Sequence, residues 1–201
     1  MQLLPKPQRD SQLLQLSEPA QLAECSQWQI VEQSEMVECA NRDRVVIFID
    51  GANLFYAAAH LNIDIDYRKL LYYLTKGRRL VRAYFYTGVD RNNEKQQSFL
   101  MWMRHNGYRV ITKDVIQLPD GSKKANLDVE IAVDMIKLSS YCDGVVLVSG
   151  DGDLAYVVNA LSYQGVQVEV VSLYSMTSDS LFNVADCYTD LATIKHDIQK
   201  V

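Results

Sequence analysis

Cysteine is scarce in this chain of 201 residues. No two of the four cysteines form a CxxC pair, and no histidine lies near them at metal-ligand spacing. This argues against zinc-finger and thioredoxin-like motifs. We expect reduced thiols, as in a cytoplasmic protein. The cysteines are Cys25, Cys39, Cys142 and Cys187.

Long apolar runs are also missing. The longest runs have the length of a strand and do not approach the roughly 20 residues of a membrane-spanning helix. The first residues combine neither a basic segment with an apolar core nor a small-residue cleavage site, so we expect no signal peptide. The sequence therefore predicts a cytoplasmic protein without a membrane partner.

Positive charge is in short supply, with 20 lysines and arginines against 25 acids and a net charge of −5. This argues against binding nucleic acid through a general basic surface. It leaves a metal-dependent nuclease open, because a bound divalent ion reverses the local charge of its acidic ligands. No GxGxxG or P-loop motif supports a nucleotide cofactor. The histidines His60, His105 and His196 have no evident nucleophile partner for a serine or cysteine hydrolase.

The chain divides by composition into two parts. Residues 1–43 hold eight glutamines, no glycine and only scattered apolar residues. We interpret them as a tail that is disordered or partly helical and that could dock on the domain or on a protein partner. Residues 44–201 are predicted to form one domain.

From Arg44 onward, apolar strands alternate with amphipathic helices, which predicts an α/β fold with a mainly parallel sheet. Helices are expected between the strands and over Leu181–Ile198. About five strands are expected, at residues 45–49, 79–87, 108–112, 144–149 and 166–172.

Acidic residues follow two of these strands. The run Val45–Ile49 ends at Asp50, and the strand at residues 144–149 is followed by Asp151 and Asp153. Ligands of parallel sheets bind beyond the carboxyl ends of the strands. If the two strands are neighbours, about 4.8 Å apart, their carboxylates could meet in one crevice. Magnesium prefers such oxygen ligands.

A further acid, Asp128, begins a predicted helix and could join the crevice. Asp134 lies six residues later, rotated by about 240° around the helix, so it should not share a metal with Asp128. Other roles stay open: Asp128 and Asp153 suit helix caps, and Asp151 suits a turn. Asn53 could cap its helix or orient Asp50, and Ser149 could satisfy the hydrogen bonds of the turn backbone.

Three segments resemble the motifs of NYN domains, in the same order. They are Phe48–Leu54 (FIDGANL), Lys124–Asp128 (KANLD) and Ser149–Leu154 (SGDGDL). The resemblance is strongest to the LabA-like branch of this PIN-like group, and it covers Arg44 to about Asp190. It implies a PIN-like three-layer sandwich around the parallel sheet.

The resemblance also implies a function. Asp50, Asp128, Asp151 and Asp153 take the positions of the catalytic, metal-binding acids of a ribonuclease that uses Mg²⁺ or Mn²⁺, and Asn53 and Ser149 take supporting positions. RNA would be the partner, with Arg91, Lys123 and Lys124 as candidate contacts to its backbone. LabA-like proteins also include regulators, so an interaction protein that represses gene expression, with weak or no nuclease activity, is the alternative.

Overall fold

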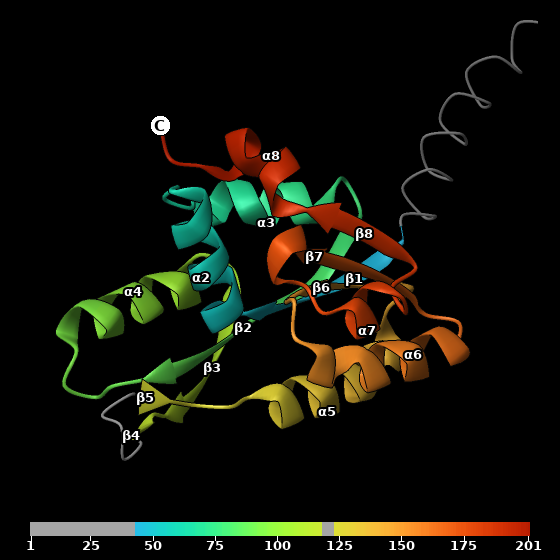
Figure 1. Ribbon diagram of the computed structural model, residues 1–201, viewed down its shortest axis with the longest axis horizontal. Helices are drawn as coiled ribbons and strands as arrows, with labels where there is room; N and C mark the ends of the chain where they lie inside the picture. The colour runs from blue at the N-terminus through green and yellow to red at the C-terminus, as the bar shows by residue number, and fades with distance from the viewer. Residues whose placement is uncertain (1–42, 118–122) are drawn as a thin grey trace, which may run out of the picture. The chain divides into compact units, whose positions relative to one another are not determined.

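The computed structural model describes residues 43–117 and 123–201. The predicted tail, apart from Asp43, lies outside the described residues, so its helical or disordered character stays a prediction. Within the described ranges the chain forms an α/β fold with helices on both faces of a parallel sheet, as predicted (Figure 1).

The main sheet has six parallel strands in the order β3-β2-β1-β6-β7-β8. From β1 the chain adds β2 and then β3 toward one edge of the sheet, and from β6 it adds β7 and then β8 toward the other edge. A separate antiparallel pair joins β4 (Ile116–Gln117) to β5 (Lys123–Lys124). The main strands are β1 (Arg44–Asp50), β2 (Arg79–Val89), β3 (Tyr108–Asp114), β6 (Gly144–Val148), β7 (Gln167–Ser172) and β8 (Cys187–Asp190).

Strand β1 lies at the centre of the core because its side chains are apolar on both faces. Val45 to Ile49 are all fully buried. Alternate residues point to opposite faces of a sheet. Accordingly, Val45, Ile47 and Ile49 contribute to one apolar cluster, and Val46 and Phe48 to the other.

The helices cover the two faces in separate groups. Figure 1 shows α3 and α8 on one side of the sheet and α5 and α6 on the other. The first group packs with β1 through residues such as Leu54, Leu70 and Ile194, and the second through residues such as Ile131 and Val158. The first group is α2 (Gly51–Leu61), α3 (Tyr67–Thr75), α4 (Glu94–His105) and α8 (Leu191–Ile198); the second is α5 (Asp128–Leu138), α6 (Ala155–Tyr163) and α7 (Asp179–Phe182).

The predicted helix over Leu181–Ile198 is wrong in its middle. Residues Cys187–Asp190 form the edge strand β8, which pairs with β7 and raises the strand number from the expected five to six. The carboxylate of Asp190 then accepts a hydrogen bond from the backbone N–H of Ala192 and caps α8. Pairing with β7, the preceding strand in the chain, therefore outweighs the local helical pattern.

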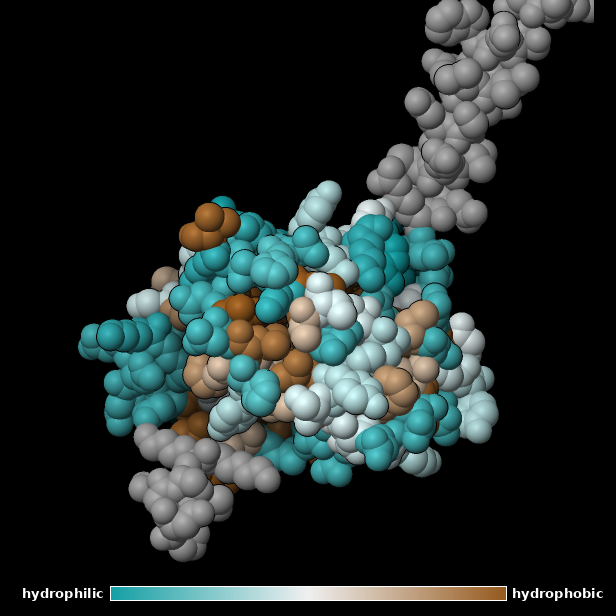
Figure 2. Space-filling view, turned by 45° about the horizontal axis from the view of Figure 1, so that its top comes forward, coloured by the Kyte–Doolittle hydropathy of each residue, from teal (hydrophilic) through white to brown (hydrophobic). Residues whose placement is uncertain are grey.

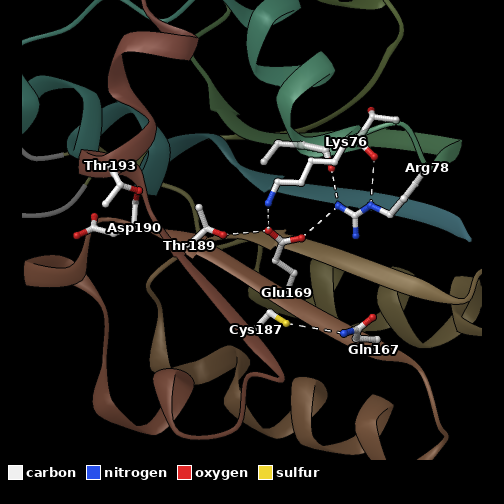
Figure 3. A network of polar contacts seen from close by, with 10 residues as sticks. Lys76, Arg78, Gln167, Glu169, Cys187, Thr189, Asp190 and Thr193 are labelled. Atoms are coloured by element: carbon white, nitrogen blue, oxygen red, sulfur yellow. Dashed lines mark hydrogen bonds and ion pairs between the residues drawn. The ribbon is translucent and has the colours of Figure 1, made fainter.

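A buried glutamate on β7 ties this half of the sheet to the α3–β2 turn (Figure 3). The Glu169 carboxylate forms ion pairs with Lys76 at 3.2 Å and Arg78 at 3.1 Å. It also accepts a hydrogen bond from the Thr189 hydroxyl at 3.0 Å. Burial raises the pKa of Glu169, but the two cations and Thr189 outweigh burial and lower it overall.

The surface mixes apolar and polar regions. Figure 2 shows apolar residues gathered near the middle of one face, with hydrophilic residues around them.

Among the described residues, no helix has both the length and the apolar character needed to cross a membrane. Of the four cysteines, Cys142 and Cys187 lie in the described part of the chain, and both are free thiols.

Candidate metal centre

The sheet changes its winding direction between β1 and β6, which are neighbouring parallel strands. The chain leaves β1 toward β2 and leaves β6 toward β7, so the loops after these two strands turn away from each other. Such a switch point opens a crevice at the carboxyl edge of a sheet. Asp50 ends β1, and Asp151 and Asp153 follow β6, so the crevice carries the predicted acids from both strands.

Asp50 is held firmly where β1 passes into α2. Its Oδ1 accepts hydrogen bonds from the backbone N–H groups of Ala52 at 3.0 Å and Asn53 at 3.2 Å, which makes Asp50 the cap of α2. Its Oδ2 accepts a hydrogen bond from the Ser149 hydroxyl at 3.3 Å. Ser149 also accepts one from the Asp151 N–H at 3.2 Å, so this buried serine links the two strand ends.

Three of the predicted acids converge. One carboxylate oxygen from each of Asp128, Asp151 and Asp153 lies within 4.8 Å of the other two. Asp128 comes from the first turn of α5, Asp151 from the loop after β6, and Asp153 from the short 3-10 helix η2 (Gly152–Leu154) that follows this loop. Asp50 is not part of this group of three, although it lies in the same crevice.

All four acids take part in electrostatic repulsion within the crevice. Burial raises the pKa of Asp128, and repulsion from Asp151 adds to this, with smaller effects from Asp50 and Asp153. Burial also raises the pKa of Asp50, against the hydrogen bonds from Asn53, Ser149 and Ala52, and Asp151 adds repulsion. A site where negative charges gather in this way favours a bound cation.

The acids line a cleft of about 460 Å³. Its other walls include the side chains of Asn53, Tyr56, Thr87 and Asn126. No lysine or arginine is among the described residues that line this cleft. The cleft is therefore strongly negative without a metal, and its neutral polar and aromatic groups surround the carboxylates.

The predicted basic contacts lie elsewhere or cannot be placed. Arg91 is paired with Asp114 through two hydrogen bonds, at 3.1 and 2.7 Å, and does not line the cleft. Lys123 and Lys124 form β5 through their backbone, while their side chains lie outside the described part of the structure.

Comparison with known proteins identifies the family of this chain. The model of the NYN domain matches residues 44–192, which is most of the chain. The chain belongs to the NYN domain family. The match includes both strands of the switch point and all four predicted acids.

Two relatives extend this result. The NYN protein is 36% identical over 165 residues to the Low amplitude and bright protein LabA of Synechococcus elongatus, covering 78% of this chain and 88% of LabA. Its structure is also similar to that of a protein of unknown function, VPA0982, from Vibrio parahaemolyticus. That similarity has a TM-score of 0.69 and 30% identity, covering 79% of this chain and 97% of the other.

The NYN domain also contains site features that the motifs alone did not assign. Asn126 accepts a hydrogen bond from the Asp128 N–H at 3.0 Å, so it orients the start of α5 beside the acids. The Asn-x-Asp spacing was a usable signal, since asparagine commonly bonds the backbone two residues later. Asp134, which the helical geometry separated from Asp128, accepts a hydrogen bond from the buried Tyr86 at 2.9 Å.

Proposed function

We propose that this NYN domain protein is a divalent-metal-dependent ribonuclease that hydrolyses phosphodiester bonds of RNA in the cytoplasm. The observation that carries the proposal is the convergence of Asp128, Asp151 and Asp153 within 4.8 Å of one another, beside Asp50, at the switch point of the sheet. Membership of the NYN family and the similarity to LabA support it.

The donor set suits a hard divalent cation. Carboxylate oxygens are the ligands that Mg²⁺ and Mn²⁺ accept, and the cleft supplies no thiol or imidazole among its described lining residues. Asp128, Asp151 and Asp153 would hold the metal, and Asp50 would add a fourth carboxylate at the end of β1. A bound cation of this kind would neutralise the acids and polarise a phosphoryl oxygen of the substrate.

The chain's own residues set the geometry for this chemistry. Ser149 holds one oxygen of Asp50 and the backbone of Asp151, so the two strand ends keep a fixed spacing. The Asp151 carboxylate accepts a hydrogen bond from the Asp153 N–H at 3.0 Å, which fixes the loop. Fixed carboxylates bind a metal and position a substrate phosphate without reorganising during the reaction.

Cleavage of a labelled single-stranded RNA tests the proposal. We expect cleavage with Mg²⁺ or Mn²⁺, none with EDTA, and a loss of at least 100-fold in Asp151→Asn, because asparagine removes a charged ligand but still caps the loop. The matched control is Asp197→Asn, which removes an exposed carboxylate on α8 that does not line the cleft. Metal-independent cleavage, or full activity in Asp151→Asn, would contradict the proposal.

A second measurement detects metal binding without requiring RNA cleavage. A cation that binds the folded protein at 100 times its Kd stabilises it by about 2.7 kcal/mol. We expect Mn²⁺ to raise the thermal midpoint of the wild type and of Asp197→Asn, and to have little effect on Asp151→Asn. An equal rise in all three proteins would show that the metal acts elsewhere.

The alternative is a regulatory protein of the LabA-like kind that represses gene expression through a protein partner, with weak or no nuclease activity. The 36% identity to LabA supports it. The residues 1–43 are the proposed docking segment. Metal binding without RNA cleavage in the two measurements above would favour this alternative.

A further inference from the structure

The exposed side of α2 carries two aromatic rings. This helix of 11 residues contains no acid, lysine or arginine, and it exposes Phe55 by 66% and Tyr56 by 62%. On the same side, Ala52 and Ala59 are small and exposed, and the exposed His60 lies one turn after Tyr56. An aromatic ring that projects into solvent is removed from water only when a ligand covers it.

The two rings extend the wall of the acidic cleft. Tyr56 lines the cleft together with Asn53 and the acids, whereas Phe55 lines a neighbouring hollow of about 550 Å³ with Ala58 and Ile63. The ring centroids of Phe55 and Tyr56 are 5.9 Å apart in an edge-to-face arrangement. The pair therefore forms a continuous aromatic surface from the carboxylates to the adjacent hollow.

The charge of the cleft indicates what this surface binds. Four carboxylates and no lysine or arginine are found among the described residues of the cleft wall, so that wall offers an RNA backbone no cation of its own. The described wall therefore offers a bound RNA neutral polar and aromatic contacts beside the acids. Aromatic side chains stack on unpaired bases and tolerate any base sequence.

Other aromatic residues near the acids cannot take this role. Tyr86 also lines the cleft, but only 1% of it is exposed, and its hydroxyl donates a hydrogen bond to Asp134. Its ring stacks on Phe48 and Tyr84 inside the fold. Among the described aromatic residues that line the cleft, Tyr56 is the exposed one.

We propose that Tyr56 and Phe55 form a stacking platform that binds unpaired bases of single-stranded RNA next to the phosphate to be cleaved. The proposal rests on the ribonuclease function of the cleft. It makes the two residues determinants of RNA affinity and of the preference for single strands, because the bases of a duplex are already stacked on one another. Binding of a protein partner by the same two rings is one of the outcomes that the experiment distinguishes.

Fluorescence of a short single-stranded RNA that contains 2-aminopurine tests the platform. Stacking on an aromatic ring quenches this base, and phosphorothioate linkages, which slow hydrolysis, allow the measurement in the presence of Mg²⁺. We expect the full chain to quench the fluorescence, and Tyr56→Ala or Phe55→Ala to weaken binding roughly tenfold. Tyr56→Trp should retain binding because it keeps a ring. Tyr163→Ala, which removes a tyrosine that is 84% exposed on α6, is the matched control.

The outcomes separate the platform from the ribonuclease. Equal RNA affinity in the wild type, Tyr56→Ala and Phe55→Ala would overturn the platform, as would equal competition by duplex RNA. Metal-dependent cleavage with an unchanged KM in Tyr56→Ala would leave the ribonuclease standing and remove the platform. Quenching that depends on Tyr56, without any cleavage, would support stacking of bases on the two rings and contradict the ribonuclease. Absence of RNA binding by the wild type would overturn the platform and leave a protein as the ligand of the two rings.

Discussion

Gly150 allows the acidic loop to lie against the rest of the fold. A Cβ atom at this position would overlap the backbone oxygen of Met176 and lie 2.8 Å from the hydroxyl of Ser172. The Gly150 carbonyl also accepts a hydrogen bond from the Ser178 N–H at 2.9 Å. A side chain here would therefore push the loop away from its neighbours and displace Asp151, the next residue.

We predict that Gly150→Ala destabilises the protein and weakens its metal binding. Overpacking of a tight site costs about 1–3 kcal/mol, and the displaced loop would carry two of the three converging acids. The matched control is Gly144→Ala at the other end of β6, where the new Cβ would lie an ordinary 3.6 Å from the Gln167 oxygen. Chemical denaturation and Mn²⁺ titration measure both effects. Equal stability of the two variants would refute the steric argument.

At the scale of residues, the sequence indicates the positions of the acids more directly than the surroundings of the basic residues, and the catalytic role of the acids stays a prediction. Asp50, Asp151 and Asp153 follow buried strands, and the covalent chain fixes that position regardless of the rest of the fold. The partner of Arg91 could not be predicted in this way, because Asp114 meets it only after β2 and β3 have paired. The partner of a long, exposed side chain depends on which residues the tertiary structure brings near it.

The elements show the same division between local and distant signals. The apolar runs of β1 and β6 predicted buried strands, because each run is complete within a few residues. Strand β8 (Cys187–Asp190) was mistaken for helix because it is short, only partly buried and held by pairing with β7. Nothing within those four residues specifies the partner strand.

Glu169 on β7 gives a prediction at the scale of elements, because its ion pairs connect β7 to the turn between α3 and β2. Its pKa in the folded protein is lowered, so its stabilising effect is complete above the ordinary glutamate pKa of about 4.3. The effect is lost as the pH falls through the lower folded value. We expect Glu169→Gln to lose about 1–3 kcal/mol at pH 7, and the difference from wild type to shrink below about pH 4.

Urea denaturation at several pH values measures this difference. Asp114→Asn is the control, because it breaks an ion pair with Arg91 whose side chains are 59% and 81% exposed. Exposed pairs contribute little in water, so this variant should change stability less than Glu169→Gln. A difference between Glu169→Gln and wild type that stayed constant down to pH 3 would mean that packing, and not charge, explains the loss.

For the whole molecule, topology decides where the acids meet. The order of strands in the sequence gave no direct information on which strands are neighbours; that β1 lies beside β6 follows from the winding of the chain in both directions from the centre. The convergence of Asp128 with Asp151 and Asp153 depends on this winding, since α5 crosses from β3 to β6 over one face. The family resemblance supplied what local patterns could not.

The division of the chain into a tail and a domain gives the last prediction. All buried apolar residues identified in the described ranges lie between Val45 and Ile198, and the NYN match begins at residue 44. The Asp43 carbonyl accepts a hydrogen bond from the Arg79 N–H at 3.0 Å, so a shortened chain should begin no later than Asp43.

We expect residues 43–201 alone to keep the thermal midpoint within a few degrees and to bind Mn²⁺ with unchanged affinity, measured by thermal melting and titration. A chain starting at residue 48, which deletes half of β1, is the destabilised control, because β1 holds the centre of the core. A large loss of stability in the 43–201 chain would show that residues 1–42 are part of the fold, and a loss of Mn²⁺ binding alone would show that they contribute to the metal centre.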